Sequence, residues 1–327
     1  MRLAELPTPL TAAPRLASAL GLTSLHVKRD DLTGFAVAGN KARQLELLLD
    51  EAAAAGADTL VTGGTTGSNF VQGAAAAAAY AGLGCHLVLA GRRTRPDAHP
   101  NLAAAVAWGA QLHWTDDPDR ASVDTALVEV ARELALRGLR PHVVPRGGAT
   151  ATGATGYRLA VDELLAQLPP SPVAPVVVVA TGSGGTLAGL VAGAVASGRP
   201  FRVVGASVSR PPEVLRPDVL RLAREVAARR GEPLPSPHDV CLVDARGPGH
   251  GLRSAEGDRA ADLALRTAGL VLDPVYTAKA LAVLPDVVGG SPAVFWHTGG
   301  LLDAVAGLLE QHRPDQHRLD QHAGGTA

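Results

Sequence analysis

The fold class follows from the stretch VVVVATGSGGT, which spans residues Val176–Thr186. Its first half is an unbroken apolar run, and such runs are typical of parallel strands that helices cover on both faces. Its second half consists of small residues and leads into a predicted helix at Thr186–Ala196. A strand, a tight turn and a helix in this order form the repeating unit of an α/β protein with a doubly wound parallel sheet.

The same alternation of strand and helix runs through most of the chain. The clearest predicted strands are Leu25–Lys28, Thr59–Thr62, His86–Ala90 and Val294–Trp296. Two loops rich in glycine and threonine, Gly63–Ser68 and Gly147–Gly156, bracket roughly 80 residues with a strand–helix rhythm of their own. We therefore predict two doubly wound domains, the smaller inserted into the larger.

Composition excludes several classes of protein. The chain has 327 residues, of which 46% are hydrophobic and 19% charged, as in a globular protein. Its net charge of −1 lacks the basic excess of a nucleic-acid-binding protein. Two cysteines, Cys85 and Cys241, are too few for a disulfide framework, and both lie in apolar runs typical of buried thiols.

Neither a targeting segment nor a membrane span is expected. Pro7, Pro9 and Pro14 interrupt the region where a signal peptide needs an unbroken apolar stretch. The uncharged stretches Phe70–Gly91 and Val173–Gly198 are broken by glycines, so we interpret each as a helix plus a buried strand. We therefore expect a cytoplasmic protein with no membrane or nucleic-acid partner.

The loop TGSGGT at Thr181–Thr186 is a candidate phosphate site. Its glycines allow successive backbone N–H groups to converge, and the N-terminus of the next helix adds partial positive charge. It is not a P-loop, because no Gly-Lys-Ser/Thr follows, and Leu187 stands where a dinucleotide-binding motif has its third glycine. The alternative interpretation is a tight turn without a ligand.

Lysine is scarce, which narrows the candidates for amine chemistry. Only Lys28, Lys41 and Lys279 occur among 30 basic residues. Lys41 lies at the predicted start of a helix, where the helix dipole disfavours an ammonium and lowers its pKa. A lysine with a lowered pKa suits Schiff-base chemistry, whereas the alternative is an ordinary surface charge.

Three further loops place polar residues after predicted strands or in turns. Gly63–Asn69 has the pattern of a carboxylate-binding loop that precedes a helix. His297–Gly300 follows the last predicted strand. Asp273–Thr277 carries Tyr276, which is either a general acid or a packing residue.

Metal and serine-hydrolase chemistry have no support in the sequence. Neither an HExxH nor a GxSxG motif occurs. The C-terminal His312, His317 and His322 are spaced so that successive side chains lie about 140° apart on a helix, which does not make one metal-binding face. We expect residues 311–327 to be a disordered tail.

Taken in order, the motifs resemble those of fold-type II enzymes that use pyridoxal 5′-phosphate (PLP). Within that group the chain is most similar to the D-cysteine desulfhydrase and 1-aminocyclopropane-1-carboxylate (ACC) deaminase family. The motifs are Leu6-Pro7-Thr8-Pro9-Leu10, Lys28-Arg29-Asp30-Asp31, Gly39-Asn40-Lys41, Ser68-Asn69, Pro145-Arg146-Gly147-Gly148, Gly156-Tyr157, Asp273-Pro274-Val275-Tyr276 and His297-Thr298-Gly299-Gly300. The resemblance implies a fold like that of the tryptophan synthase β-subunit, with PLP in the cleft between the domains.

The resemblance also implies roles for individual residues. Lys41 would hold PLP covalently, Asn69 would hydrogen-bond its phenolic oxygen, and Thr298 would face its pyridine nitrogen. The phosphate would be bound by Thr181, Gly182, Ser183, Gly184, Gly185 and Thr186. The substrate would be bound by Gly67, Ser68, Asn69 and Tyr276, with Tyr276 as an acid, base or positioning group.

Five positions depart from the family pattern, and they concern the substrate more than the cofactor. Ala149 replaces the Ser of a Gly-Gly-Ser motif. Gly67 stands where the family commonly has Gln, and Phe70 stands where it commonly has His. His250 replaces a second active-site Tyr and, with an ordinary pKa of about 6.5, is expected to transfer protons near neutral pH. Thr277 stands where ACC deaminases carry Glu, as in desulfhydrases.

The resemblance implies a PLP-dependent lyase or deaminase of a small amino acid, with D-cysteine desulfhydrase-like β-elimination to a 2-oxo acid and ammonia as the leading hypothesis. The alternatives are ACC deamination, β-replacement in a specialised biosynthetic pathway, and a non-catalytic PLP-binding protein. A homodimer is also implied, with a large domain of residues 1–46 and 157–310 and an inserted small domain of residues 47–156.

Overall fold

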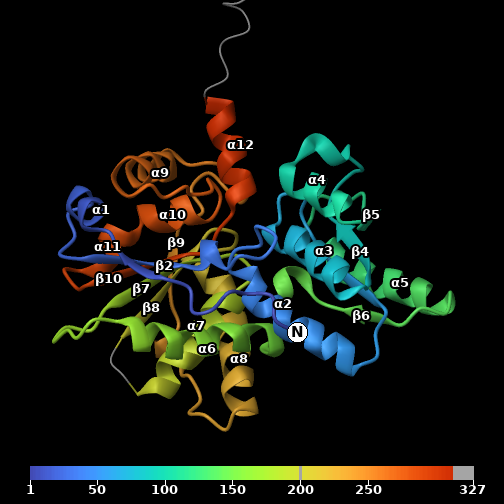
Figure 1. The fold of residues 1–327 in the computed structure, drawn as a ribbon, viewed down its shortest axis with the longest axis horizontal. Coiled ribbons are helices and arrows are strands. Elements are labelled where there is room, and N and C mark those ends of the chain that lie inside the picture. The colour runs from blue at the N-terminus through green and yellow to red at the C-terminus, as the bar shows by residue number, and fades with distance from the viewer. Residues whose placement is uncertain (199–200, 312–327) are drawn as a thin grey trace, which may run out of the picture.

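The computed structural model describes residues 1–198 and 201–311. Two α/β domains lie side by side, each built on its own sheet (Figure 1). All strands of the smaller sheet come from residues 59–143, between strands of the larger sheet. The predicted architecture, a small domain inserted into a larger one, is therefore confirmed.

The large domain contains a six-stranded sheet surrounded by helices. Its strands are β1 (Leu10–Ala12), β2 (Leu25–Arg29), β7 (Val176–Thr181), β8 (Arg202–Ser207), β9 (Cys241–Asp244) and β10 (Ala293–His297). Its helices are α1 (Pro14–Ala19), α2 (Lys41–Ala54), α6 (Ala151–Gln167), α7 (Gly185–Ser197), α8 (Pro212–Arg229), α9 (Ala255–Ala268), α10 (Thr277–Ala282), α11 (Leu284–Val288) and α12 (Leu301–Gln311). The strand order is β1-β2-β10-β7-β8-β9, and only the β1–β2 pair is antiparallel.

Alternate residues of β7 face opposite sides of the large sheet. Val176, Val178 and Ala180 belong to one buried core, and Val177 and Val179 belong to the other. Residues of α1, α9, α10 and α11 fill the first core, whereas residues of α6, α7 and α8 fill the second. The unbroken apolar sequence of β7 therefore corresponds to a strand covered on both faces, as predicted.

The small domain contains a parallel sheet of four strands. Its strands are β3 (Thr59–Gly64), β4 (Gly84–Leu89), β5 (Gln111–Trp114) and β6 (Pro141–Val143), in the order β5-β4-β3-β6. Its helices are α3 (Asn69–Ala81) and α4 (Pro100–Ala107) on one face and α5 (Ser122–Leu136) on the other. Four 3-10 turns complete the part of the chain that the structure describes: η1 (Asp30–Leu32), η2 (Pro96–Ala98), η3 (Arg146–Gly148) and η4 (Pro237–Asp239). Helix α2 packs against both α3 and α6, so it lies between the domains (Figure 1).

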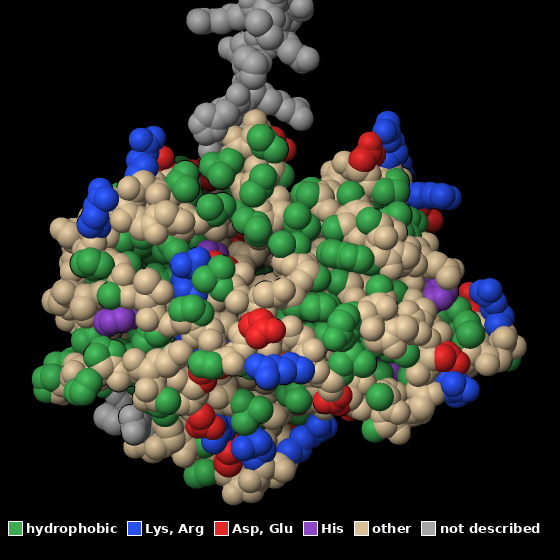
Figure 2. All heavy atoms as spheres, viewed as in Figure 1, with side chains coloured by type: hydrophobic (Ala, Val, Ile, Leu, Met, Phe, Trp, Pro, Cys, Tyr) green, Lys and Arg blue, Asp and Glu red, His purple; other side chains and the backbone are tan. Residues whose placement is uncertain are grey.

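Further expectations concern the two uncharged stretches, the surface charge and the C-terminal tail. The uncharged stretches form α3 with β4 and β7 with α7, each a helix plus a buried strand as predicted. Within the described residues, no helix combines the length and the apolar character that a membrane crossing requires. The face shown in Figure 2 carries basic and acidic side chains interspersed, without a large area of either sign. The expected tail beyond Gln311, with its three histidines, lies outside the described residues.

Candidate active site

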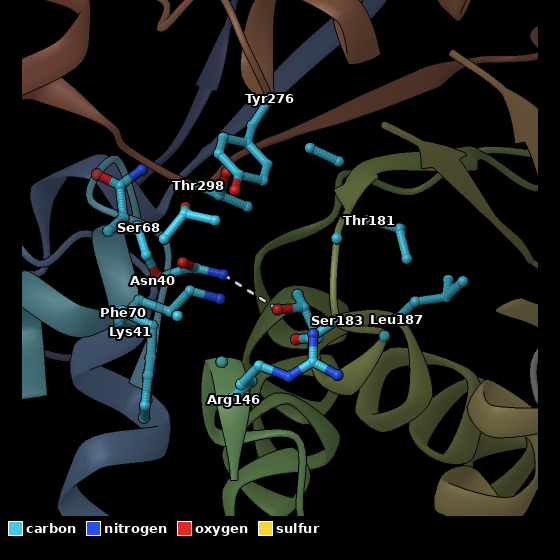
Figure 3. A pocket seen from close by; sticks show the side chains of 18 of the residues that line it. Asn40, Lys41, Ser68, Phe70, Arg146, Thr181, Ser183, Leu187, Tyr276 and Thr298 are labelled. Carbon is cyan, nitrogen blue, oxygen red and sulfur yellow. Dashed lines mark hydrogen bonds between the residues drawn. The ribbon is translucent and has the colours of Figure 1, made fainter. Parts of the chain in front are cut away.

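A cavity opens between the two domains at the carboxyl ends of their parallel strands. Thr181 ends β7, Gly64 ends β3 and Thr298 follows β10, and all three line the cavity. Ligands of open α/β sheets bind at this edge, where loops and helix N-termini converge. The cavity brings together Lys41, Ser68, Asn69, Thr181, Gly182, Ser183, Gly184, Thr186, His250, Tyr276 and Thr298, several of which are labelled in Figure 3.

Lys41 is the first residue of α2, and its half-buried side chain extends into the cavity toward the loop of Ser183 (Figure 3). Burial lowers the pKa of its amine from the ordinary 10.5 to about 8. The direction of this shift agrees with the expectation from the helix start, but its cause is desolvation. The other lysines are engaged elsewhere, because Lys28 pairs with Glu163 and Lys279 donates to two backbone carbonyls.

Backbone contacts hold the Lys41 segment against the other loops of the site. The Asn40 N–H donates to the carbonyl of Thr298 at 3.0 Å, and the Asn40 amide donates to the Thr186 hydroxyl at 3.2 Å (Figure 3). Gly39 has a φ of +57°, and a Cβ there would lie 2.4 Å from the Thr298 oxygen. Only glycine allows this close approach, which sets Lys41 at a fixed position relative to Thr298.

A buried ionic network anchors the first turn of α2. The Arg43 guanidinium donates to both oxygens of Asp30 at 2.8 Å and to Glu163 on α6 at 2.9 Å. Lys28 pairs with Glu163, and the Trp296 indole donates to Asp30 at 2.8 Å. The motif around Asp30 is therefore structural, because it fixes the helix that carries Lys41.

The loop after β7 and the N-terminus of α7 have the geometry of an anion site. Gly184 has a φ of +100°, which favours glycine, and its neighbours Ser183 and Thr186 add hydroxyl groups. Helix α7 has 13 residues, so its N-terminal amides present partial positive charge to the cavity. A Cβ at Gly185 would lie 3.3 Å from the Cα of Ala149. Gly185 therefore faces Ala149 and does not line the cavity.

The N-terminus of α3 faces the cavity from the small domain. Ser68 caps the helix by accepting a 3.4 Å hydrogen bond from the Val71 N–H, and Asn69 is the first helical residue. Gly67 lies outside this cavity, in an adjoining groove. A Cβ at Gly67 would lie 2.9 Å from Nε2 of His99, so the imidazole ring occupies the space that a larger residue 67 would need.

Tyr276 and His250 stand together on the large-domain side, with their rings in an edge-to-face contact at 6.4 Å. Burial raises the pKa of Tyr276 to about 12, so its hydroxyl is neutral and able to donate. Burial and the charges of Arg120 and Lys279 lower the pKa of His250 to about 4. The expectation that His250 exchanges protons by titrating near neutral pH is therefore wrong, because its imidazole is uncharged there.

The structure places Thr277 outside the cavity and Arg120 in its lining, and the sequence motifs predicted neither position. Thr277 is buried and donates to a carboxylate oxygen of Asp273 at 2.6 Å, so it stabilises the turn before α10 and does not line the cavity. Arg120 lines the cavity from the loop before α5, and no sequence signal distinguishes it from an ordinary loop arginine. Arg146, from the motif Pro145-Arg146-Gly147-Gly148, also lines the cavity. Its guanidinium donates two hydrogen bonds to the Asp124 carboxylate, of 2.7 and 2.6 Å.

The residues of this cavity fit PLP. Its loop after β7 can cradle a phosphate, and a Cβ at Gly182 would lie 3.2 Å from the Tyr276 ring. A single lysine of lowered pKa faces that loop, and the hydroxyl of Thr298 and the amide of Asn69 line the walls. The site thus offers an anion cradle, an amine and neutral hydrogen-bonding groups, which PLP requires.

Comparison with known proteins places the chain in a family. The model of the family "Pyridoxal-phosphate dependent enzyme" matches residues 1–299. D-cysteine desulfhydrase of Yersinia enterocolitica is 38% identical over 313 residues, covering 90% of this chain and 91% of the relative. The D-cysteine desulfhydrase of Salmonella typhi is 36% identical over 308 residues, covering 90% of this chain and 92% of the relative.

Solved structures agree with this placement. The crystal structure of an ACC deaminase homologue has a TM-score of 0.86 and 34% identity, and the match covers 94% of each chain. Maize serine racemase has a TM-score of 0.63 at 16% identity over 97% of this chain and 93% of that chain, which shows a shared fold. The chain belongs to the family of pyridoxal-phosphate-dependent enzymes, and within it to the lyases and deaminases related to D-cysteine desulfhydrase and ACC deaminase.

Proposed function

We propose that the enzyme catalyses β-elimination from D-cysteine or a related small β-substituted amino acid. With D-cysteine, the C–S bond breaks and water is consumed, which yields a 2-oxo acid, ammonia and hydrogen sulfide. The relatives at 36–38% identity over 90% of the chain are D-cysteine desulfhydrases. One observation carries the proposal: a lysine amine of lowered pKa and a neutral tyrosine hydroxyl line the same cavity.

Lys41 would hold the cofactor and later act as the base. PLP, when bound, supplies a ring that withdraws electrons from the substrate carbon. Once the substrate amine displaces it, the Lys41 amine would take the proton from the α carbon. A pKa of about 8 leaves a useful share of this amine neutral at physiological pH, which a lysine at 10.5 would not provide.

The α3 terminus and Tyr276 would bind the substrate from opposite domains. Ser68 and Asn69 present a helix N-terminus, which favours the substrate carboxylate. Tyr276, with a pKa of about 12, would donate its proton toward the departing sulfur and would not act as a base. The neutral His250 beside it would accept or donate a hydrogen bond without changing charge.

The group expected at the pyridine nitrogen favours elimination over cyclopropane opening. Thr298, which lines the cavity, would offer a hydroxyl to that nitrogen, and a neutral partner would make the ring a weaker electron sink than a carboxylate would. The α carbon of ACC carries no proton, so ring opening needs a strong sink from its first step. Loss of a thiol needs less assistance, so we expect ACC to be the slower substrate.

Steady-state kinetics on one preparation test this proposal. We expect kcat/KM for D-cysteine or β-chloro-D-alanine to exceed that for ACC, with no turnover by Lys41→Ala. A preference for ACC by tenfold, or about 1.4 kcal/mol of transition-state stabilisation, would reverse the assignment. A PLP-loaded protein that turns over none of these amino acids would instead be a non-catalytic binding protein or would act on a specialised substrate.

We also propose that the enzyme works as a homodimer in the cytoplasm. The support is the resemblance to the bacterial D-cysteine desulfhydrases. Light scattering coupled to gel filtration would test the dimer, since one chain has a mass of 33.3 kDa. A peak of single-chain mass across the working concentration range would refute it.

A further inference from the structure

A buried polar cluster joins the two domains beside the active-site cavity. Asp303 lies in the first turn of α12, and Asn101 lies in the first turn of α4. Helices α12 and α4 contact each other across the domain boundary (Figure 1). Asn101 is 0% exposed and Asp303 is 8% exposed, so both side chains need hydrogen-bond partners within the protein.

The amide nitrogen of Asn101 is the centre of the cluster. It lies 3.0 and 3.2 Å from the two carboxylate oxygens of Asp303. It also lies 3.1 Å from the carbonyl of Gly67 and 3.3 Å from Oδ1 of Asn69. His99, which caps α4, places its Nε2 3.6 Å from Asp303. The cluster thus connects α12 of the large domain to the start of α3.

The chemistry of these partners fixes the orientation of Asn101. A carboxylate and a backbone carbonyl only accept hydrogen bonds, so the group that faces them must be the NH₂ of the amide. The opposite atom, Oδ1 of Asn101, is buried and has no partner among the described residues. No donor among the described residues favours the reversed orientation, so Asp303 and the Gly67 carbonyl together fix the amide, and Asp303 is the side chain of the pair.

The orientation of the Asn101 amide in turn determines that of the Asn69 amide. The Asn69 atom that faces the Asn101 NH₂ must be an acceptor, which makes it Oδ1. Because the amide is planar, the Asn69 NH₂ is left for the cavity that Asn69 lines. An acceptor such as the phenolic oxygen of PLP requires a donor at this position.

We propose that Asp303 is a positioning residue which, through Asn101, orients the Asn69 amide with its NH₂ toward the phenolic oxygen of PLP. The inference rests on the role proposed for Asn69 at the cofactor and is independent of which substrate is used. A carboxylate of the large domain thereby sets the orientation of an amide side chain of the small domain. The relay therefore acts only when α12 and α4 are in contact.

The charges around Asp303 affect how well it accepts. Burial, and then the negative charge of Asp273, raise the pKa of Asp303 to about 7, whereas the bond from Asn101 opposes this shift. His99, at the N-cap of α4, faces Asp303. Burial lowers the pKa of the His99 imidazole, and the negative charge of Glu310 opposes this shift. Above pH 7 the Asp303 carboxylate accepts from Asn101, and protonation at lower pH weakens that bond.

A double-mutant cycle on PLP binding tests the relay. The variants are Asp303→Ala, Asn69→Ala and both together, with Asp303→Asn as the conservative change. Val305→Ala is the matched control, since Val305 lies on the same helix and is 42% exposed. The readouts are the dissociation constant of PLP for apo protein, the pH midpoint of the visible absorbance of the bound cofactor, and the thermal unfolding of each variant.

We expect Asp303→Ala to weaken PLP binding about tenfold when Asn69 is present and less than about twofold when it is absent, because the two act as a unit. Asp303→Asn should stay within about threefold of the parent, because its amide oxygen can accept the same bond. It should also shift the pH midpoint of the cofactor absorbance less than Asp303→Ala does. Val305→Ala should change neither quantity.

Several results would overturn the inference. An equal effect of Asp303→Ala in both backgrounds would mean that it acts only on domain packing. Unchanged PLP affinity and unchanged pH midpoint in Asp303→Ala would remove its role, as would normal PLP binding by Asn69→Ala. Failure of the enzyme to process D-cysteine would contradict the proposed function alone, since none of these readouts involves a substrate.

Discussion

The reactivity of Lys41 toward the aldehyde of PLP tests the centre of the site, because only a neutral amine attacks a carbonyl. With a pKa of about 8, roughly 9% of the amine is neutral at pH 7, against roughly 0.03% for the ordinary value of 10.5. Burial therefore raises the reactive fraction about 300-fold. Because the pKa is lowered, the rate should rise with pH and level off above about pH 8, instead of climbing past pH 10.

The assay uses apo protein, mixed with excess PLP across this pH range and trapped at intervals with borohydride. Peptide mapping then locates the pyridoxyl group, which we expect on Lys41. Lys28, buried against Glu163, and Lys279, bonded to two carbonyls, serve as internal controls in the same molecule. Lys41→Ala should give no lysine-bound visible absorbance while its thermal unfolding remains near that of the parent.

Two results would refute the reasoning. A midpoint near 10.5 would mean that burial does not lower the pKa of the Lys41 amine. A label on Lys28 or Lys279 would mean that the cofactor is held at a different place in the fold.

Three further predictions follow from the same contacts. Ser183→Asp places a negative charge in the anion cradle and should raise the dissociation constant of PLP at least tenfold by spectroscopic titration, whereas Ser183→Ala should change it only slightly. Tyr276→Phe should lower kcat for D-cysteine by about 10²-fold or more in steady-state assays while PLP affinity stays unchanged; an unchanged kcat would exclude its role as acid. Arg43→Met leaves the buried Asp30 without its ionic partner and Glu163 with Lys28 alone, and should cost about 3–5 kcal/mol in urea unfolding. The exposed control Arg221→Met should stay within about 0.5 kcal/mol, and equal losses would contradict the importance of burial.

The parts of the fold that the sequence predicted are those with a strong apolar pattern. β7 is buried on both faces, and α7 follows a glycine-rich turn. The amino-acid sequence alone therefore predicts both elements. Helix α9 was not predicted, although its buried residues Gly257, Ala260 and Ala264 lie on one face and charged residues lie on the others, a pattern typical of an amphipathic helix. Helices α10 and α11, of 6 and 5 residues, are too short to show a helical period.

The candidate site was predicted where its residues stand in motifs next to strand ends. Lys41, Ser68, Tyr276 and Thr298 line one cavity as the ordered motifs implied. The relay of Asp303 and Asn101 was not foreseen, because the residues are 202 positions apart and neither is in a motif. The motif containing Tyr276 and Thr277 did not predict which of the two side chains reaches the cavity: Tyr276 lines it, whereas Thr277 turns to Asp273.

The position of β10 has a consequence for how the cell makes the enzyme. β10 is the last strand in the described chain, yet it pairs with both β2 and β7 and so fills the middle of the large sheet. A ribosome therefore releases the flanking strands long before the strand that joins them, and the loop with Thr298 that fastens Asn40 comes later still. A nascent chain that stops short of β10 has an open seam with unpaired strand edges and an incomplete cofactor pocket. Cofactor loading must follow completion of synthesis, and chains truncated before Ala293 should aggregate and fail to retain PLP.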